Sequence, residues 1–110
     1  MKFETHNDVS VSINGTGLQG YIKVDYDVLR RAFGEPNDGD GYKVDAEWDL
    51  LFEDGIVATV YNYKTGRNYA GSRGGGTPTN RIVDWHIGGK NPEVVERVKG
   101  IIAKWQEEGR

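Results

Sequence analysis

The chain has 110 residues, with 17 acidic and 14 basic side chains, a formal net charge of −3 and no cysteine. The acidic balance argues against general binding of DNA or RNA, which needs a basic face. The lack of cysteine excludes disulfides, thiolate catalysis and cysteine-rich zinc sites. We expect a single domain over residues 1–110, without a membrane span or a signal peptide.

The N-terminal part of the chain predicts short extended segments. Residues 1–8 are polar and are expected to form a flexible leader, or at most an edge strand. Valine and isoleucine alternate with serine over residues 9–13, which predicts a short strand, and Asn14-Gly15 predicts a tight turn. Residues 18–24 are expected to form a second short strand or an extended connection.

A short helix is predicted over residues 25–34. The carboxylate of Asp25 can cap its first turn, and Leu29 and Phe33 share one apolar face with an alanine at helical spacing. Gly34 suits the C-terminal end of the helix, and the proline two residues later prevents continuation.

The run Asn-Asp-Gly-Asp-Gly at residues 37–41 is rich in oxygen ligands. An EF-hand calcium loop needs about twelve residues, a glycine at the sixth position and a closing glutamate. The run is shorter and lacks this spacing, so we expect an ordinary Asx-type turn.

Residues 42–52 show the clearest pattern in the chain, a regular alternation of apolar and charged side chains. This period predicts a half-buried antiparallel strand, and Asp54-Gly55 then predicts a hairpin with a return strand over residues 56–64. The predicted core face carries Tyr42, Val44, Ala46, Trp48, Leu50 and Phe52, and the other face carries Lys43, Asp45, Glu47 and Asp49.

The register of this hairpin stays open at the level of sequence. A two-residue turn would pair Phe52 with Val57 and send Tyr61 and Tyr63 to the core side. One extra turn residue would place Ile56, Ala58 and Val60 inside and the two tyrosines outside.

The last part of the chain predicts a loop, a strand and a helix. Residues 65–80 are expected to form a long glycine-rich loop, which no Gly-Lys-Ser/Thr follows as a Walker loop would require. Residues 81–87 predict a strand that Gly88-Gly89 ends, and Asn91 begins an amphipathic helix. Its apolar stripe is Val94, Val95, Val98, Ile101, Ile102 and Trp105. We therefore predict an α+β domain, with an antiparallel sheet of four to five strands, a short helix and a C-terminal helix packed on the sheet.

One segment, residues 55–83, contains no aspartate or glutamate, and the rest of the chain holds all 17 acids against 10 bases. Arginine and lysine beside tyrosine suit a nucleotide, because rings stack on bases while cations hold phosphates. The predicted ligand-binding residues are Tyr61, Tyr63, Lys64, Arg67, Tyr69, Arg73, Arg81 and His86.

His86 follows Asp84 by two residues on the same predicted strand face. An Asp-x-His pair can serve acid–base chemistry or bind a metal, whereas a strand histidine beside a loop often hydrogen-bonds the backbone. Neither paired carboxylates, nor a catalytic triad, nor a metal cluster is apparent from the spacing. We therefore expect a binding protein without catalytic residues, metal or cofactor.

Several motifs over about residues 15–102 resemble a widespread family of small phage proteins. They are Gly20-Tyr21, Phe33-Gly34-Glu35-Pro36, Gly39-Asp40-Gly41-Tyr42-Lys43, Glu47-Trp48, Phe52-Glu53-Asp54-Gly55 and Trp85-His86-Ile87-Gly88-Gly89. Within this resemblance the chain is similar to the anti-CBASS sponges, which sequester the cyclic nucleotide signals of bacterial antiviral defence as tetramers and do not cleave them.

The resemblance implies a homo-oligomeric, non-enzymatic protein in the cytoplasm of an infected bacterium, with a cyclic dinucleotide or related signalling nucleotide as its partner. Two alternatives remain. An anti-CRISPR-like inhibitor would use the acidic face of Asp45, Glu47 and Asp49 to mimic nucleic acid. A small nucleotide-processing enzyme would use Asp84 and His86.

Overall fold

The computed structural model describes residues 1–71 and 74–108 and contains one sheet of five antiparallel strands. The strands are β1 (Phe3–Thr5), β2 (Gly17–Lys23), β3 (Glu47–Phe52), β4 (Val57–Tyr61) and β5 (Asp84–Gly89), in the spatial order β1-β3-β4-β5-β2. The N-terminal segment thus contributes an edge strand, the second of the two alternatives considered for it. The predicted fold class is confirmed.

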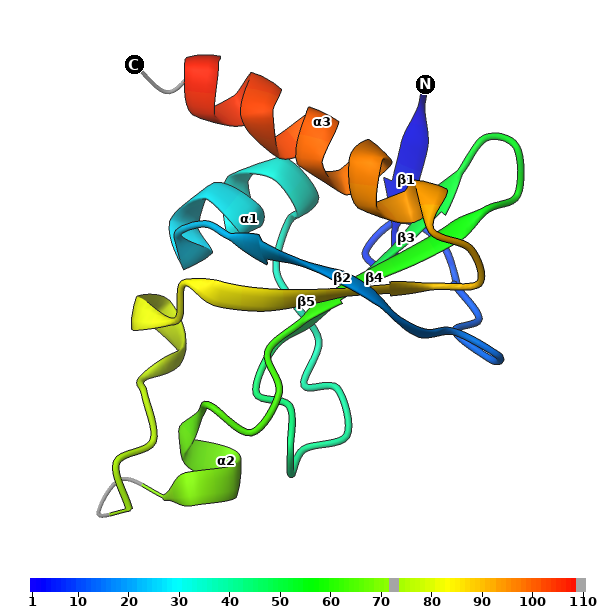
Figure 1. The fold of residues 1–110 in the computed structure, drawn as a ribbon. Coiled ribbons are helices and arrows are strands. Elements are labelled where there is room, and N and C mark those ends of the chain that lie inside the picture. Colours follow the sequence, from blue (N-terminus) through cyan, green and yellow to red (C-terminus); the bar gives the residue numbers. More distant parts are fainter. Residues whose placement is uncertain (72–73, 109–110) are drawn as a thin grey trace.

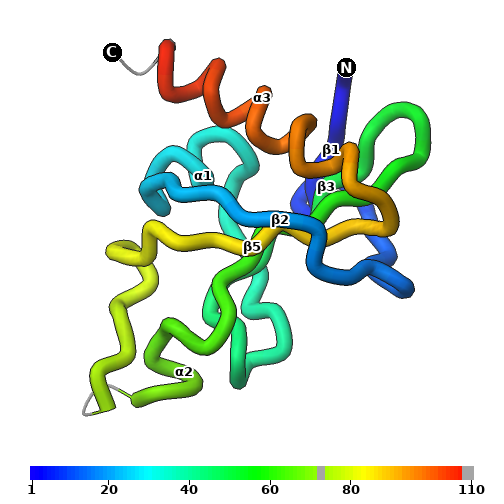
Figure 2. The backbone as a smooth tube through the Cα atoms, in the orientation of Figure 1, coloured from blue at the N-terminus to red at the C-terminus, as the bar shows by residue number. Residues whose placement is uncertain are grey.

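Two helices, α1 (Tyr26–Phe33) and α3 (Glu93–Glu108), cover one face of the sheet (Figure 1). α3 packs on β2, β4 and β5, and α1 packs on α3. A short helix, α2 (Arg67–Ala70), and the 3-10 turn η1 (Thr79–Arg81) lie in the segment between β4 and β5. Figure 2 shows the loops after α1 and after β4 extending on the side of the sheet opposite to α1 and α3.

The core lies between the sheet and these two helices. Trp48 and Trp85 are fully buried at its centre, with ring centroids 5.4 Å apart in an edge-to-face arrangement. Each indole N–H donates to a backbone carbonyl, Trp48 to Gly34 at 2.7 Å and Trp85 to Val24 at 3.0 Å. The core therefore accepts two large polar-tipped rings without leaving either donor unpaired.

The β3–β4 hairpin adopts the second of the two possible registers. Leu50 pairs with Ala58 and Leu51 with Val57, so residues 53–55 form a three-residue loop with Gly55 at φ 87°. A positive φ favours glycine there. Because the return strand is shifted by one residue, its Ala58 and Val60 face the core and its tyrosine faces away.

The predicted strands differ from the structure in extent: the return strand predicted to residue 64 ends at Tyr61, and the strand predicted from residue 81 begins at Asp84. Residues 9–13 do not form a strand, and the segment lies outside the sheet. β3 begins at Glu47 and not at residue 42, because residues 42–46 belong to a loop held by side-chain hydrogen bonds.

Local predictions at glycines and caps also need correction. Gly88 and Gly89 do not end β5 but belong to it, because they pair with Thr59 and Ala58 of β4. Both positions favour glycine, since a Cβ at Gly88 would meet Thr59 and one at Gly89 would meet Val94. The segment 65–80 is not structureless, since it contains α2 and η1. Asp25 precedes α1 without a capping hydrogen bond from its side chain.

Candidate functional site

One row of residues crosses the sheet on the side away from α1 and α3. Glu47 of β3 pairs with Tyr61 of β4, which pairs with His86 of β5, which pairs with Tyr21 of β2. Successive residues of a strand face opposite sides of a sheet, and the neighbouring Trp85 faces the helices. The row therefore belongs to the other side, which we call the open face.

His86 lies among three tyrosine rings. Its ring centroid is 5.0 Å from that of Tyr21, 5.4 Å from Tyr61 and 5.6 Å from Tyr63, each in an edge-to-face arrangement. We call these four residues the tyrosine–histidine cluster. Burial lowers the pKa of His86, so its imidazole is mainly neutral at pH 7. Burial raises the pKa of Tyr61, with a smaller contribution from Glu47, so the cluster is an uncharged aromatic surface.

Lys64 lies at the rim of this surface. Its Nζ is 5.3 Å from the ring centroids of both Tyr63 and Tyr69, a cation–π geometry. Its backbone has φ 60°, the left-handed region, and its N–H donates to the carbonyl of Lys43 at 2.7 Å. Strained non-glycine residues of this kind are frequent at ligand sites, and here the residue is joined to Lys43 by a backbone hydrogen bond.

The loop of residues 37–46 folds back over the acidic end of the row. Asn62, fully buried at the end of β4, accepts hydrogen bonds from the backbone N–H groups of Asp45 and Ala46 at 2.7 and 3.1 Å. Asp40 Oδ1 accepts bonds from the next backbone N–H groups, chiefly that of Tyr42, and they lower its pKa. The predicted Asx-type turn is confirmed by the bond from Gly39 N–H to the side chain of Asn37.

Between this loop and the sheet is a cavity of about 680 Å³, which we call the acid cavity. Lys43, Tyr61 and Tyr63 line it together with four carboxyl groups, those of Asp38, Asp40, Glu47 and Asp49. Such a volume falls within the range of small-molecule sites. The cavity combines aromatic walls with an excess of negative charge.

Glu47 and Asp49 are 9% and 6% exposed, an acid pair that the sequence analysis missed. Burial, then the hydrogen bond and charge of Asp49, raise the pKa of Glu47 to about 8. Asn37 Nδ2 donates to Asp49 Oδ2 at 2.9 Å, and the proton on Glu47 is the donor in the hydrogen bond between Glu47 and Asp49. The pair therefore holds one proton and one negative charge near neutral pH.

The structure joins some of the predicted site residues and separates others. Tyr61, Tyr63 and His86 meet in the cluster, with Lys64 and Tyr69 beside it. Within the described part of the chain, no contact joins Arg67 or Arg81 to the cluster: Arg67 begins α2, and Arg81 ends η1, which packs on α1. Arg73 lies outside the described residues.

The acidic strand face is not the exposed surface that nucleic-acid mimicry requires. Glu47 and Asp49 are buried, and Asp45 accepts hydrogen bonds from Asn62 Nδ2 and from the backbone N–H of Asn68. Asp84 pairs with Lys23 at 3.6 Å, and within the described chain it makes no hydrogen bond to His86.

Tyr21 and the acid pair had one usable signal in the sequence. Tyr21 lies in the predicted second strand, and Glu47 and Asp49 are two residues apart on a strand, which places both carboxyl groups on one face. What the pattern did not show is that a loop covers that face.

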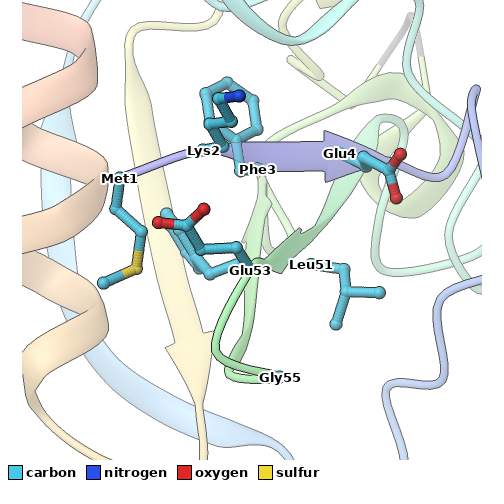
Figure 3. A pocket seen from close by; sticks show the side chains of 8 residues that line it. Met1, Lys2, Phe3, Glu4, Leu51, Glu53 and Gly55 are labelled. Carbon is cyan, nitrogen blue, oxygen red and sulfur yellow. The ribbon is translucent and has the colours of Figure 1, made fainter.

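A second hollow, of about 750 Å³, lies at the N-terminal edge of the sheet beside β1. Figure 3 shows Met1 and Glu53 at one side of it and Glu4 at the other. Both glutamates are exposed, and nothing there resembles the acid pair, so we regard the open face as the better candidate.

The described residues contain no group of three or more His, Asp or Glu side chains placed to hold a metal ion. No helix in the described ranges is long and apolar enough to cross a membrane. The chain matches no model of a protein family, and no curated protein is significantly similar to it in sequence.

Proposed function

We propose that the protein binds a nucleotide on the open face and retains it without cleaving it. The observation that carries this proposal is the tyrosine–histidine cluster, which adjoins both the acid cavity and two lysines, Lys64 and Lys43, which we call the lysine rim. Stacking on aromatic rings contributes about 1–3 kcal/mol per base, and every base has a ring face to offer.

The charges suggest how the ligand lies. Four carboxyl groups line the acid cavity and would repel a phosphate, so the phosphates remain outside. Lys64, whose Nζ is 5.3 Å from the Tyr63 ring centroid, and Lys43, which lines the cavity, place cations beside the rings. A base would then enter the cavity against Tyr61 and Tyr63 while its phosphate reaches the lysines.

The resemblance to the anti-CBASS sponges makes a cyclic nucleotide the preferred ligand and sequestration in the infected bacterial cytoplasm the preferred role. Self-association fits the edge of the sheet. Tyr21 at the end of the row is 61% exposed, and Leu18 on the same edge strand is 47% exposed. A second copy packed against β2 would cover both side chains and close the row around a ligand with two bases.

Isothermal titration against a panel of cyclic di- and trinucleotides tests the proposal, with chromatography to show that the ligand is recovered intact. His86→Ala should weaken binding by about tenfold or more, because it removes the centre of the cluster. Val83→Ala is the control, since Val83 is 36% exposed and does not line the acid cavity. The absence of micromolar binding to every member would rule out the proposal for that panel.

The acid pair favours a second candidate, a small acid–base enzyme. Two adjacent carboxyl groups, one of which keeps its proton near neutral pH, can act as general acid and general base. In this scheme Glu47 donates a proton and Asp49 accepts one, in place of the Asp84 and His86 pair predicted from the sequence. Turnover of any nucleotide in the panel that Glu47→Gln abolishes would favour this candidate over sequestration.

A further inference from the structure

The rings of Tyr42 and Tyr69 form a second aromatic surface beside the tyrosine–histidine cluster. Their centroids are 5.4 Å apart, and the two rings are inclined to each other by 52°. Tyr42 is 56% exposed and Tyr69 is 41% exposed, so both present ring surface to solvent. We call these two residues the outer tyrosine pair. Adjacent exposed aromatic side chains of this kind are typical of binding surfaces.

The outer tyrosine pair lies where the 37–46 loop meets α2, and hydrogen bonds already join these two segments. The backbone N–H of Asn68 donates to Asp45 Oδ2 at 3.2 Å, and Asn68 Nδ2 donates to the carbonyl of Val44 at 3.3 Å. A Cβ at Gly66 would overlap the Asp45 carboxylate, so the close approach of the two segments depends on a glycine there. The two rings are therefore not needed to close this junction, and the junction holds them in place before a ligand arrives.

Lys64 lies between the outer tyrosine pair and the tyrosine–histidine cluster. Its Nζ is 5.3 Å from the ring centroid of Tyr69, in the pair, and 5.3 Å from that of Tyr63, in the cluster. Among the residues that the structure describes, no carboxylate forms a salt bridge with Lys64, so its charge is available to an anion. The surface thus presents a ring, a cation and a second ring in this order. A dinucleotide presents its groups in the matching order, because its two bases lie on either side of the phosphate that links them.

We propose that the outer tyrosine pair is a second base-binding subsite. One base lies against Tyr61 and Tyr63, the linking phosphate lies at Lys64, and the second base stacks on Tyr69 and Tyr42. Stacking on tyrosine tolerates every base, so this subsite recognises the presence of a second base and not its identity. The inference rests on the proposed function, because it adds a second half to the same nucleotide site.

Titration calorimetry with the linear dinucleotide pApA and with adenosine 3′,5′-bisphosphate (pAp) tests the second subsite. Both ligands carry two phosphate groups, and only pApA has a second base, so the comparison separates the base from the charge. The unmodified protein should bind pApA about tenfold or more tighter than pAp, because a base stacked on an aromatic ring contributes at that level.

Substitutions in the two halves of the site should act differently on this ratio. Tyr69→Ala and Tyr42→Ala should each lower the affinity for pApA much more than the affinity for pAp, whereas Tyr69→Phe keeps the ring and should keep the ratio. His86→Ala lies in the cluster and should weaken the binding of both ligands. Val83→Ala is again the control and should change neither affinity.

The outcomes separate the second subsite from the proposed function. Equal binding of pApA and pAp, or a ratio that neither alanine variant of the outer tyrosine pair lowers, would overturn the second subsite and leave nucleotide binding intact. The absence of binding to pAp, pApA and every cyclic nucleotide of the panel would count against both. Cyclic di-AMP, titrated in parallel, distinguishes the two sources of paired bases: tighter binding than pApA assigns the site to a closed ring, and weaker binding assigns it to an open chain. Far-ultraviolet circular dichroism of both alanine variants shows whether a loss of binding comes from unfolding.

Discussion

The two faces of the sheet follow different rules. On the helix-covered face, Trp48 and Trp85 are fully buried, apolar neighbours surround them, and both indole donors are paired. On the open face, Glu47 is buried and keeps a proton, Asp49 is a buried carboxylate beside it, and Lys64 has a positive φ. The first face contributes to stability, whereas the second carries several local costs.

Costs of this kind gather where a protein keeps residues for a ligand and not for folding. None of these three features is needed to form the sheet. A hydrophobic or amide side chain would fit the strand positions of Glu47 and Asp49, and Lys64 lies outside the strands. The comparison therefore predicts that truncating a side chain on the helix-covered face mainly changes stability, and that truncating one on the open face mainly changes binding.

Trp48→Ala should have the largest effect of the substitutions considered. It empties the centre of the core, and losses of about 3–5 kcal/mol in the free energy of unfolding are typical of such a change. Urea denaturation followed by far-ultraviolet circular dichroism measures it. Tyr63→Ala, on the open face and 38% exposed, should change that free energy by less than about 1 kcal/mol. Similar losses in the two variants would contradict the division between the faces.

Gly88→Ala should come next, because it places a methyl group where the open face has no room. The added Cβ would meet the Thr59 hydroxyl and approach Tyr61 Cε1 within 3.3 Å. Overpacking of this sort costs about 1–3 kcal/mol. Gly17→Ala is the matched control, since a Cβ at Gly17 has no atom within 4 Å and the residue lies on the neighbouring strand. If Gly88→Ala is as stable as the control, the side chains of Thr59 and Tyr61 move aside at little cost.

Glu47 should make the stability fall as the pH rises. Its pKa is raised from 4.5 to about 8 in the folded protein, so between these values the folded state binds more protons than the unfolded state. Its contribution is thus complete below pH 4.5 and is lost as the pH passes 8. Glu47→Gln should remove this fall, whereas Glu53→Gln, an exposed acid on the hairpin loop, should retain it.

Urea denaturation at pH 5.5, 7 and 8.5 measures the free energy of unfolding. The difference in this free energy between the unmodified protein and Glu47→Gln gives the contribution of Glu47. His86 acts in the opposite direction, because its lowered pKa makes the folded state bind fewer protons below pH 6.5. Asp54, whose pKa Arg97 lowers to about 2, changes only at more acidic pH. If the difference in the free energy of unfolding between the two proteins stays the same from pH 5.5 to pH 8.5, Glu47 ionises normally.

The fold was predictable from the sequence because its signals are local. Alternation placed β3 and its core face, and the amphipathic stripe placed α3. The site was only half predictable. Tyr61 and Tyr63 were identified from composition, and His86 from its place on a strand two residues after Asp84. The acid pair depends on Asn62, whose side chain holds the 37–46 loop over the strand through hydrogen bonds to residues 16 and 17 positions away. Such long-range hydrogen bonds leave no periodic signal, and neither does the strand pairing that brings Tyr21 to His86.

Lys64→Gly should give the smallest change in stability and still impair binding. Glycine relieves the left-handed conformation at φ 60°, which is worth about 1–2 kcal/mol for other residues. It also removes the cation from the rings of Tyr63 and Tyr69, a loss of about 0.5–1 kcal/mol at exposed sites, and it adds backbone freedom to the unfolded chain. These terms nearly cancel, so the free energy of unfolding should stay within about 1 kcal/mol of the original.

Nucleotide affinity of Lys64→Gly should nevertheless fall and lose part of its salt dependence, because the variant lacks the cation that is proposed to bind a phosphate. Lys99→Gly would not be a fair control inside α3, so Lys99→Ala serves instead, and it should leave both affinity and salt dependence unchanged. If the affinity of Lys64→Gly is unchanged, Lys64 does not contribute to binding, and the acid cavity holds the ligand by its base alone.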